Sequence, residues 1–413
     1  MDLITKLMWY KGDNMTDYSK LGLTPNLQSI NSPISRKITD ATEIDMQNGI
    51  SPGLIDYSRI TSSGRAYQAI ISSSKSGGAF TDIQDAFDYV NRLGGGKILL
   101  RTGTYNVTSN INFYSNIYLE GDDADTAVIN FGSTNSGIQC VGTTNGTLSN
   151  ISISNIGITN AWAGTPNGAI VINYCNDILV EKCRFQSNGS STNLAHNDIN
   201  IVGNSSRIYI LENRFIEGPT TLYVGAVSDI FFNENTINSS WGFLVEDVGT
   251  ATQLMIKNNI INKSGTNADA LIFLESPGPR LMIEGNRFIN PQTDSIYIGN
   301  TIGAVVSNNI IDGNSNSLNG IIIADGALLC SITGNVVIRC TSGTAADGVQ
   351  IQNSNYNIIS GNAFGSNSGY GITITGGTAS STNVVTGNIF RTNTQGTIND
   401  AGTLTVISGN GGA

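Results

Sequence analysis

One short pattern of apolar and polar positions recurs nine times between residues 178 and 390. Most copies carry an apolar residue, any residue, a second apolar residue, two further residues, an Asn, any residue and a bulky apolar residue, as in IYILENRF from 208 and LMIEGNRF from 281. The copies are 22 to 30 residues apart, with the Asn position at Cys183, Asn213, Asn235, Asn259, Asn286, Asn309, Asn335, Asn362 and Asn388. A self-similar period of this length predicts a solenoid.

Alternation inside the repeat predicts strands. In the segment DALIFLESPGPRLMIEGNRF, Leu271 and Phe273 alternate with Ile272, which is the period of two of a β-strand. A Pro-Gly-Pro turn at 277–279 interrupts the strand, and a second alternating run follows. Short strands with Gly and Asn at the corners and no helical period predict an all-β protein, a parallel β-helix of roughly 10–12 rungs.

The Asn column is expected to be a corner ladder. Its amides would bond between rungs, and its backbone would accommodate a left-handed turn. The columns on either side of it are apolar and form the predicted core stacks: Val180, Ile210, Phe232, Ile256, Ile283, Val306, Ile332, Ile359 and Val385, and Phe185, Phe215, Ile237, Ile261, Phe288, Ile311, Val337, Phe364 and Phe390.

A further column of the same run should point outward although it is mostly apolar: Leu179, Tyr209, Phe231, Met255, Met282, Val305, Ser331, Ile358 and Val384. An apolar stripe of this length is rarely left in water. We therefore expect either neighbouring copies in a homo-oligomer or the N-terminal arm to cover it. The alternative is a bulged strand that turns these residues into the core.

The segment that precedes the repeats carries a family resemblance. Thr81 to Gln84 forms a capping box for a helix with Ile83, Ala86, Phe87 and Val90 on one face, ended by Gly94 to Gly96. The run GGAFTDIQDAFDYVNRLGGGKILLRTGTYNVTSNINFYSNIYLEGDD, within residues 66–131, resembles the start of the pectate-lyase-like (pectin lyase-like) right-handed parallel β-helix superfamily, including phage tailspikes.

The resemblance implies a right-handed coil whose first rung is capped by this helix. It also implies a tailspike-like or tail-fibre-like virion or extracellular protein, a homotrimer, and a polysaccharide as partner. It says less about chemistry, because the superfamily includes lyases, glycosidases, epimerases and inactive binding proteins. The expected domains are an N-terminal arm or adaptor (1–60) for a virion or baseplate partner, the capping helix and first rungs (61–131), and the β-helix body (132–413).

Composition narrows the partners. A net charge of −10 and a pI near 4.6 argue against nucleic acid and anionic membranes. The five cysteines show no metal spacing, so we expect buried core residues, with Cys175 and Cys183 a minor disulfide candidate, and no metal or cofactor. The first residues lack the apolar run of a signal peptide, and no segment is long and apolar enough for a membrane span.

Candidate chemistry lies on the first strand of each rung. Aligning these strands places Asp247 and Glu275 in one outward column on adjacent rungs, about 5 Å apart, and Glu275 and Asp325 two rungs apart, about 10 Å. Carboxyl pairs at such spacings perform glycoside hydrolysis, and crowding raises the pKa that a general acid needs. The expected catalytic residues are Asp247, Glu275 and Asp325, and the expected substrate-binding residues are Tyr223, Trp241, Asp269, Asp294 and Tyr297.

Two function classes stay open at this point. One is a hydrolase that cleaves a neutral or weakly charged surface polysaccharide; the other is a non-catalytic structural or receptor-binding fibre. A lyase or epimerase is disfavoured because no basic residue falls on the first strands and an acidic groove repels polyuronates. The competing explanation for each acid is turn chemistry, because Asp, Asn and Gly are common at strand ends.

Overall fold

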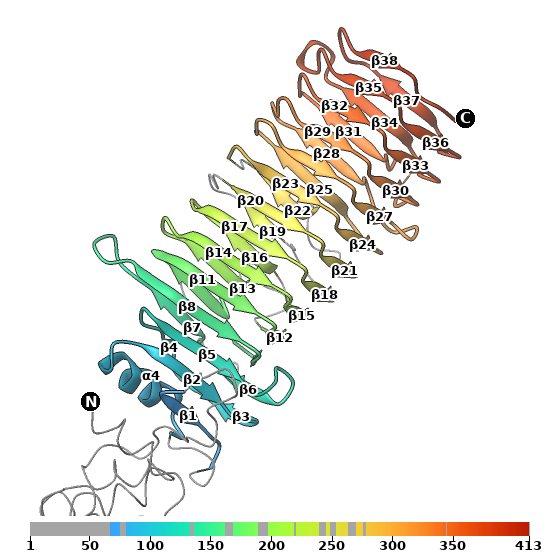
Figure 1. The fold of residues 1–413 in the computed structure, drawn as a ribbon. Helices are drawn as coiled ribbons and strands as arrows, with labels where there is room; N and C mark the ends of the chain where they lie inside the picture. The colour runs from blue at the N-terminus through green and yellow to red at the C-terminus, as the bar shows by residue number, and fades with distance from the viewer. Residues whose placement is uncertain are drawn as a thin grey trace, which may run out of the picture.

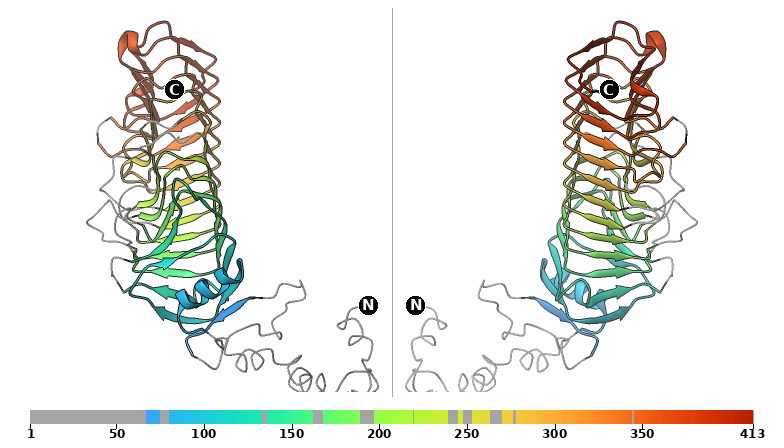
Figure 2. Two further views of the ribbon diagram at one scale, coloured as in Figure 1. Left: turned by 90° about the vertical axis from the view of Figure 1, so that its left-hand side faces the viewer. Right: turned by 90° about the vertical axis from the view of Figure 1, so that its right-hand side faces the viewer.

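The computed structural model describes residues 67–74, 80–132, 136–161, 168–188, 197–218, 220–238, 245–247, 253–262, 270–275, 278–343 and 345–412. Within these ranges the chain winds into an elongated solenoid of stacked rungs, with the first strands at one end and the last at the other (Figure 1). All strand pairs within the three sheets are parallel, and the sheets line the sides of the coil along its length (Figure 2). The predicted all-β parallel β-helix is confirmed.

The first strand of each rung belongs to a 12-stranded sheet, here called sheet C. Its strands are β4 (Ile111–Asn112), β7 (Ile138–Val141), β10 (Ile170–Asn173), β13 (Asn197–Val202), β16 (Thr220–Val224), β19 (Val245–Asp247), β22 (Ala270–Leu274), β25 (Asp294–Gly299), β28 (Ile321–Ala324), β31 (Val349–Gln352), β34 (Tyr370–Thr375) and β37 (Gly396–Asp400). A short 3₁₀ helix, η3 (Gly377–Ala379), follows β34.

The second strand of each rung belongs to a 14-stranded sheet, sheet A. Its strands are β1 (Ala69–Ile71), β2 (Gly96–Leu100), β5 (Ile117–Gly121), β8 (Leu148–Ser154), β11 (Cys175–Glu181), β14 (Ser206–Leu211), β17 (Ser228–Asn233), β20 (Leu254–Lys257), β23 (Leu281–Glu284), β26 (Val305–Ser307), β29 (Ser331–Thr333), β32 (Ile358–Ser360), β35 (Val384–Thr386) and β38 (Val406–Ser408).

A third strand follows the Asn corner and completes the rung in a 12-stranded sheet B, which the sequence pattern did not separate from the second run. Most of these strands have three residues, which is too short for a period of two to be visible. They are β3 (Gly103–Asn106), β6 (Ala127–Asn130), β9 (Gly157–Thr159), β12 (Arg184–Gln186), β15 (Arg214–Ile216), β18 (Thr236–Asn238), β21 (Ile260–Asn262), β24 (Arg287–Ile289), β27 (Ile310–Asp312), β30 (Val336–Ile338), β33 (Ala363–Gly365) and β36 (Ile389–Arg391).

The predicted Asn ladder is present at the corner between sheets A and B. Asn286 shows the arrangement: its Oδ1 accepts from the backbone N–H and the amide of Asn259, and its Nδ2 donates to the carbonyl of Ile256 and to Asn309. One detail of the prediction is wrong. The left-handed residue is the one before the Asn, such as Gly285 with φ 69°, because the ladder amide must reach inward while the preceding residue makes the turn.

The core stacks fill the coil as predicted. Phe185 and Phe215 lie on adjacent rungs with ring centroids 4.7 Å apart, and the flanking column is equally buried. All five cysteines are buried and free, so the disulfide candidate is not formed and the expectation of core cysteines is confirmed.

The predicted helix is α4 (Ile83–Arg92), with Ile83, Ala86, Phe87 and Val90 buried. Its N-cap is Asp82, whose carboxylate accepts from the N–H of Asp85, one residue later than the predicted box. Phe87 packs edge-on against Phe113, with centroids 4.5 Å apart, which joins the helix to the core. No helix in the described ranges is long and apolar enough to cross a membrane.

The apolar stripe of sheet A points outward, so the alternative of a bulged strand is wrong. Its members are in register from rung to rung, and none of them is buried, whereas the residues on either side of each are. Tyr209 is 37% exposed, and its ring stacks on that of Phe231 at 4.8 Å. The predicted N-terminal arm, residues 1–60, lies outside the described residues, so its expected contact with the stripe stays a prediction.

Candidate functional site

One outward column crosses sheet C without interruption. The column contains Asn112, Gln139, Val171, Asn200, Tyr223, Glu246, Phe273, Tyr297, Ile322, Gln350, Thr373 and Asn399. The residues on either side of it in the strands, such as Leu222 and Val224, are fully buried in the core. The column therefore faces away from the core, because successive side chains of a strand point to opposite faces.

Four consecutive members of this column form an accessible window. Tyr223, Glu246, Phe273 and Tyr297 are half-buried, whereas Asn200 on one side is 4% exposed and Ile322 on the other is 5% exposed. The rings of Phe273 and Tyr297 stack with centroids 5.0 Å apart and an interplanar angle of 18°. A flat aromatic surface with carboxylates beside it suits the apolar faces and hydroxyl groups of a sugar.

The predicted column of acids is wrong by one residue. Asp247 pairs in register with Leu274 and with Val224, which belong to the core-facing column, and not with Glu275. Glu275 is one residue beyond Leu274, at the level of Gly299 and Ala324, so it does not share a column with Asp325 either. The side chain of Asp247 lies outside the described residues, as do Trp241 and Asp269. Their proposed roles stay predictions.

Glu246 takes the outward place that the alignment had given to Asp247. It is opposite Tyr223 on one rung and Phe273 on the next. Burial raises the pKa of its carboxyl above the ordinary value, and the nearby charge of Glu275 raises it further. The sequence alignment of the first strands did not single out Glu246 as a site residue. Val245 could have revealed the register, because an apolar Val in the core requires the next side chain to point outward.

Glu275 lies beside the window. It is exposed and lies directly after the end of β22, two residues after Phe273. One rung and two residues separate the Cα atoms of Glu246 and Glu275, a diagonal of about 8 Å. The charge of Glu275 also raises the pKa of Tyr297, which places it within electrostatic reach of both groups.

Asp325 has a partner in the window. The hydroxyl of Tyr297 donates a hydrogen bond to its carboxylate, and this bond, together with burial, raises the pKa of the phenol. Asp325 itself sits at a left-handed corner with φ 52°, as do Asn300 and Asn353 at the corresponding places of neighbouring rungs. Turn chemistry thus accounts for the residue type at this position, and the hydrogen bond gives its carboxylate a positioning contact to the aromatic stack.

Asp294 belongs to a separate ladder at the start of the strands. Its Oδ1 accepts from the backbone N–H and the side-chain amide of Asn319, at 2.7 and 3.0 Å. Asn319 in turn accepts from the N–H of Asp347, and Asp347 from the N–H of Tyr370. These contacts join successive rungs. The proposed role of Asp294 in substrate binding stays a prediction.

A buried acid lies on the N-terminal side of the window. Asp198 in β13 is 1% exposed; its Oδ1 accepts from the amide of Asn188 at 3.0 Å, and its Oδ2 has no hydrogen-bond partner among the described residues. A Cβ on Gly218 would lie 2.4 Å from that Oδ2, so glycine provides the space. Burial raises the pKa of Asp198 to about 8. Asp198 is therefore protonated at neutral pH and contributes no charge to the site.

No three His, Cys, Asp or Glu side chains gather closely enough to hold a metal ion within the ranges that the structure describes. The acids of the window fit proton transfer better than metal binding, since Glu246 and Glu275 stand apart on a diagonal and Asp325 is held by Tyr297.

Comparisons with known proteins agree with the architecture. A family model described as periplasmic copper-binding protein (NosD) matches residues 272–407, which is less than half of the chain. The A-module of mannuronan C-5 epimerase AlgE6 from Azotobacter vinelandii is similar with a TM-score of 0.60 at 15% identity, over 80% of this chain and 94% of the module.

Two other similar structures are those of a bacterial surface adhesin and a bacteriophage tailspike. PfbA, a surface adhesin of Streptococcus pneumoniae, has a TM-score of 0.51 at 15% identity, over 78% of this chain and 88% of the adhesin. Tailspike protein 3 of bacteriophage CBA120 has a TM-score of 0.50 at 14% identity, over 81% of this chain and 58% of the tailspike. A search of curated proteins found no significant match. At these identities the similar structures show the fold of the chain, a parallel β-helix.

Proposed function

We propose that this protein binds a surface polysaccharide along the outer face of sheet C and hydrolyses it there. The observation that carries the proposal is the window itself, in which Glu246, with its raised pKa, stands between Tyr223 and the stacked rings of Phe273 and Tyr297. Similar folds include enzymes that act on polysaccharides, an adhesin and a phage tailspike, which supports a glycan as the partner.

In the proposed reaction Glu246 is the general acid. Its raised pKa favours the protonated form, which a general acid needs to give a proton to the leaving oxygen of the glycosidic bond. Glu275 is exposed and acts either as the base that activates water or as the nucleophile. Separations of about 5 to 5.5 Å give retention and about 6.5 to 9.5 Å give inversion. Their Cα diagonal allows either, so the anomer of the first product, followed by NMR, assigns the mechanism.

The substrate is proposed to be neutral or weakly charged. Glu246, Glu275 and Asp325 give the face an acidic character, which repels a polyuronate. The described strands of sheet C contain no Lys or Arg side chain that could neutralise a uronate or abstract its proton. These two features also disfavour lyase and epimerase chemistry at this face.

A second function has its own support. Asp325 accepts a hydrogen bond from Tyr297, and Asp294 accepts one from Asn319 on the next rung. Two of the predicted site acids therefore have structural contacts. A non-catalytic fibre or receptor-binding protein would use the same aromatic window only to hold a glycan. Extracellular or virion placement, a homotrimer, and a virion or baseplate partner for residues 1–60 are part of both proposals.

One experiment separates the two functions. The full chain is incubated with a panel of cell-surface polysaccharides, and reducing ends and unsaturated products are assayed together with binding. Reducing ends that disappear in Glu246→Gln and Glu275→Gln, with binding retained, support the hydrolase. Binding without turnover on any glycan supports the fibre, and unsaturated product contradicts the argument against a lyase. The control is Glu284→Gln on sheet A, whose carboxylate pairs with Lys257 away from the site.

A further inference from the structure

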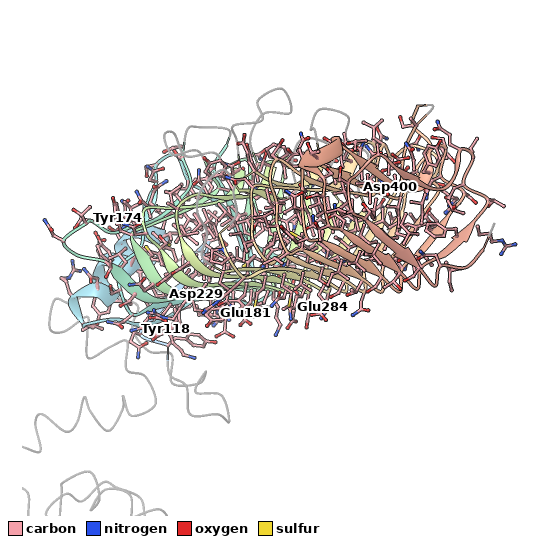
Figure 3. All side chains as sticks on the ribbon, turned by 90° about the horizontal axis from the view of Figure 1, so that it is seen from above. Tyr118, Tyr174, Glu181, Asp229, Glu284 and Asp400 are labelled. Atoms are coloured by element: carbon pink, nitrogen blue, oxygen red, sulfur yellow. The ribbon has the colours of Figure 1, made fainter. Side chains whose placement is uncertain are left out.

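The outer face of sheet A changes character along the solenoid. From β11 to β23 its strands and adjoining corners carry charges of both signs, with acids in excess: Asp177, Glu181, Lys182, Arg207, Glu212, Asp229, Glu234, Lys257, Arg280 and Glu284. Glu181, Asp229 and Glu284 all lie along one side of the molecule (Figure 3). This part of the face is here called the charged half.

The following five strands form what is here called the uncharged half, the orange and red end of sheet A (Figure 1). From β26 to β38, the strands and the corner residues on both sides contain no Asp, Glu, Lys or Arg. Two outward columns cover it: Val305, Ser331, Ile358, Val384 and Val406, and Ser307, Thr333, Ser360, Thr386 and Ser408.

A third column borders the uncharged half at the corner that enters sheet A. Leu329, Tyr356 and Leu404 have left-handed backbones, with φ of 56°, 59° and 60°, and are 61%, 53% and 76% exposed. A left-handed conformation costs such residues about 1–2 kcal/mol, which Gly or Asn largely avoids. Bulky apolar side chains are therefore held in solvent at strained positions, which is the kind of outlier that points to function.

The same corner shows that the backbone does not require apolar residues. In the charged half the corresponding positions are Asp177, Arg207 and Asp229, with φ between 55° and 59°, and Asp177 forms an ion pair with Arg207. The turn is the same in both halves and only the side chains differ. Exposed Leu and Tyr in place of Asp and Arg are therefore a property of the surface and not of the turn.

We propose that the uncharged half of sheet A is the surface through which copies of this chain associate. A chain with a net charge of −10 repels its own copies over most of its surface, and this face is where two copies can approach without opposing like charges. Depletion of charge at the centre, with exposed Ile, Leu, Val and Tyr, is the composition of an interface core.

Two other occupants fit the face less well. Residues 1–66 are richer in charged residues than the chain as a whole, and they precede β1, which is separated from β26 by eight strands of sheet A. Glycan sites combine aromatic rings, which stack on the faces of sugars, with polar groups that fix the hydroxyls. The three outward columns of the uncharged half supply Ser and Thr hydroxyls but a single aromatic ring, that of Tyr356.

The test measures the mass of the full chain in solution. The wild type is expected to be an oligomer by light scattering or sedimentation at tens of micromolar. Ile358→Lys, at a 45% exposed position that needs no core repacking, is expected to weaken association at least 100-fold. The matched control, Met282→Lys, lies in the same outward column in the charged half and is expected to leave the mass unchanged. A monomeric wild type, or an oligomer that Ile358→Lys leaves intact, overturns the proposal.

A chemical cross-link locates the contact independently. All five native cysteines are buried, so Ser360→Cys introduces the one accessible thiol of the chain. A short bismaleimide is expected to link two copies of this variant and to lose that ability when Ile358→Lys is added. Ser152→Cys, on β8 in the same sheet, is the control and should not link. Linking of the Ser152→Cys variant alone would place the interface elsewhere and contradict the assignment.

Discussion

The hydroxyl of Tyr297 donates to the carboxylate of Asp325 on the next rung, while its ring stacks on Phe273. This contact gives the carboxylate of Asp325 a setting different from that of Glu246. Asp325 is engaged with a phenol at a turn, whereas Glu246 is half-buried in the window with a raised pKa. The two carboxyl groups should therefore respond very differently to the removal of their charge.

Glu246→Gln should lower kcat about 100-fold or more, because it removes the proposed general acid. Asp325→Asn should cost less than about 10-fold, because the amide oxygen still accepts from Tyr297. Steady-state kinetics on a polysaccharide that the wild type cleaves provides the measurement. Equal losses in the two variants would show that the assignment of the acid is wrong.

The pH dependence of turnover should depend on Glu275. Its charge raises the pKa of Glu246, so Glu246 stays protonated to a higher pH than it otherwise would. Activity that needs this proton falls as pH rises through the pKa of Glu246. The residual activity of Glu275→Gln should therefore decline at a lower pH than that of the wild type. The alkaline limbs of the two kcat/KM profiles provide the measurement. An unchanged alkaline limb would contradict the coupling.

Phe273→Ala should weaken glycan binding about 10-fold, since it removes half of the stacked aromatic surface. A matched control lies on the outer face of sheet A. Phe231→Ala removes the partner of Tyr209 from an equivalent stack on sheet A and should leave the affinity unchanged. Calorimetric titration with oligosaccharide tests both variants; a similar loss in both would mean that binding is not confined to sheet C.

Asn286→Ala should destabilise the fold by about 3 kcal/mol or more. The substitution leaves the buried N–H of Asn259 and the carbonyl of Ile256 without their side-chain partner, and each unsatisfied group costs about 1–3 kcal/mol. Urea unfolding is the measurement. Asn262→Ala, at an exposed position of β21, is the control and should change the free energy of unfolding by less than about 0.5 kcal/mol.

Asp198 should make the protein less stable in alkali. Its pKa is raised to about 8 by burial, so the folded state holds a proton that the unfolded chain releases near pH 4. The resulting stability is fully present below about pH 4 and is lost as pH rises through about 8, with a slope of at most about 1.4 kcal/mol per pH unit. Asp198→Asn keeps the oxygen that Asn188 bonds and removes this dependence.

The free energy of unfolding is measured in urea at pH 5 and pH 9 for the wild type and for Asp198→Asn. The value of the variant minus that of the wild type should be larger at pH 9 than at pH 5. A difference that is the same at both pH values would show that Asp198 does not titrate in this range.

The sequence by itself determined the repeat, the alternation that makes strands, the Asn ladder and the apolar stacks, because each rung repeats the same local physics. Register and accessibility were decided only by the tertiary structure. The variable loops between rungs hide the alignment of β19, so the outward direction of Glu246 follows only from the pairing of Val245 with Leu222 and Ile272. Likewise, burial in the folded coil raises the pKa of Asp198, and stacking of complete rungs divides sheet A into its charged and uncharged halves.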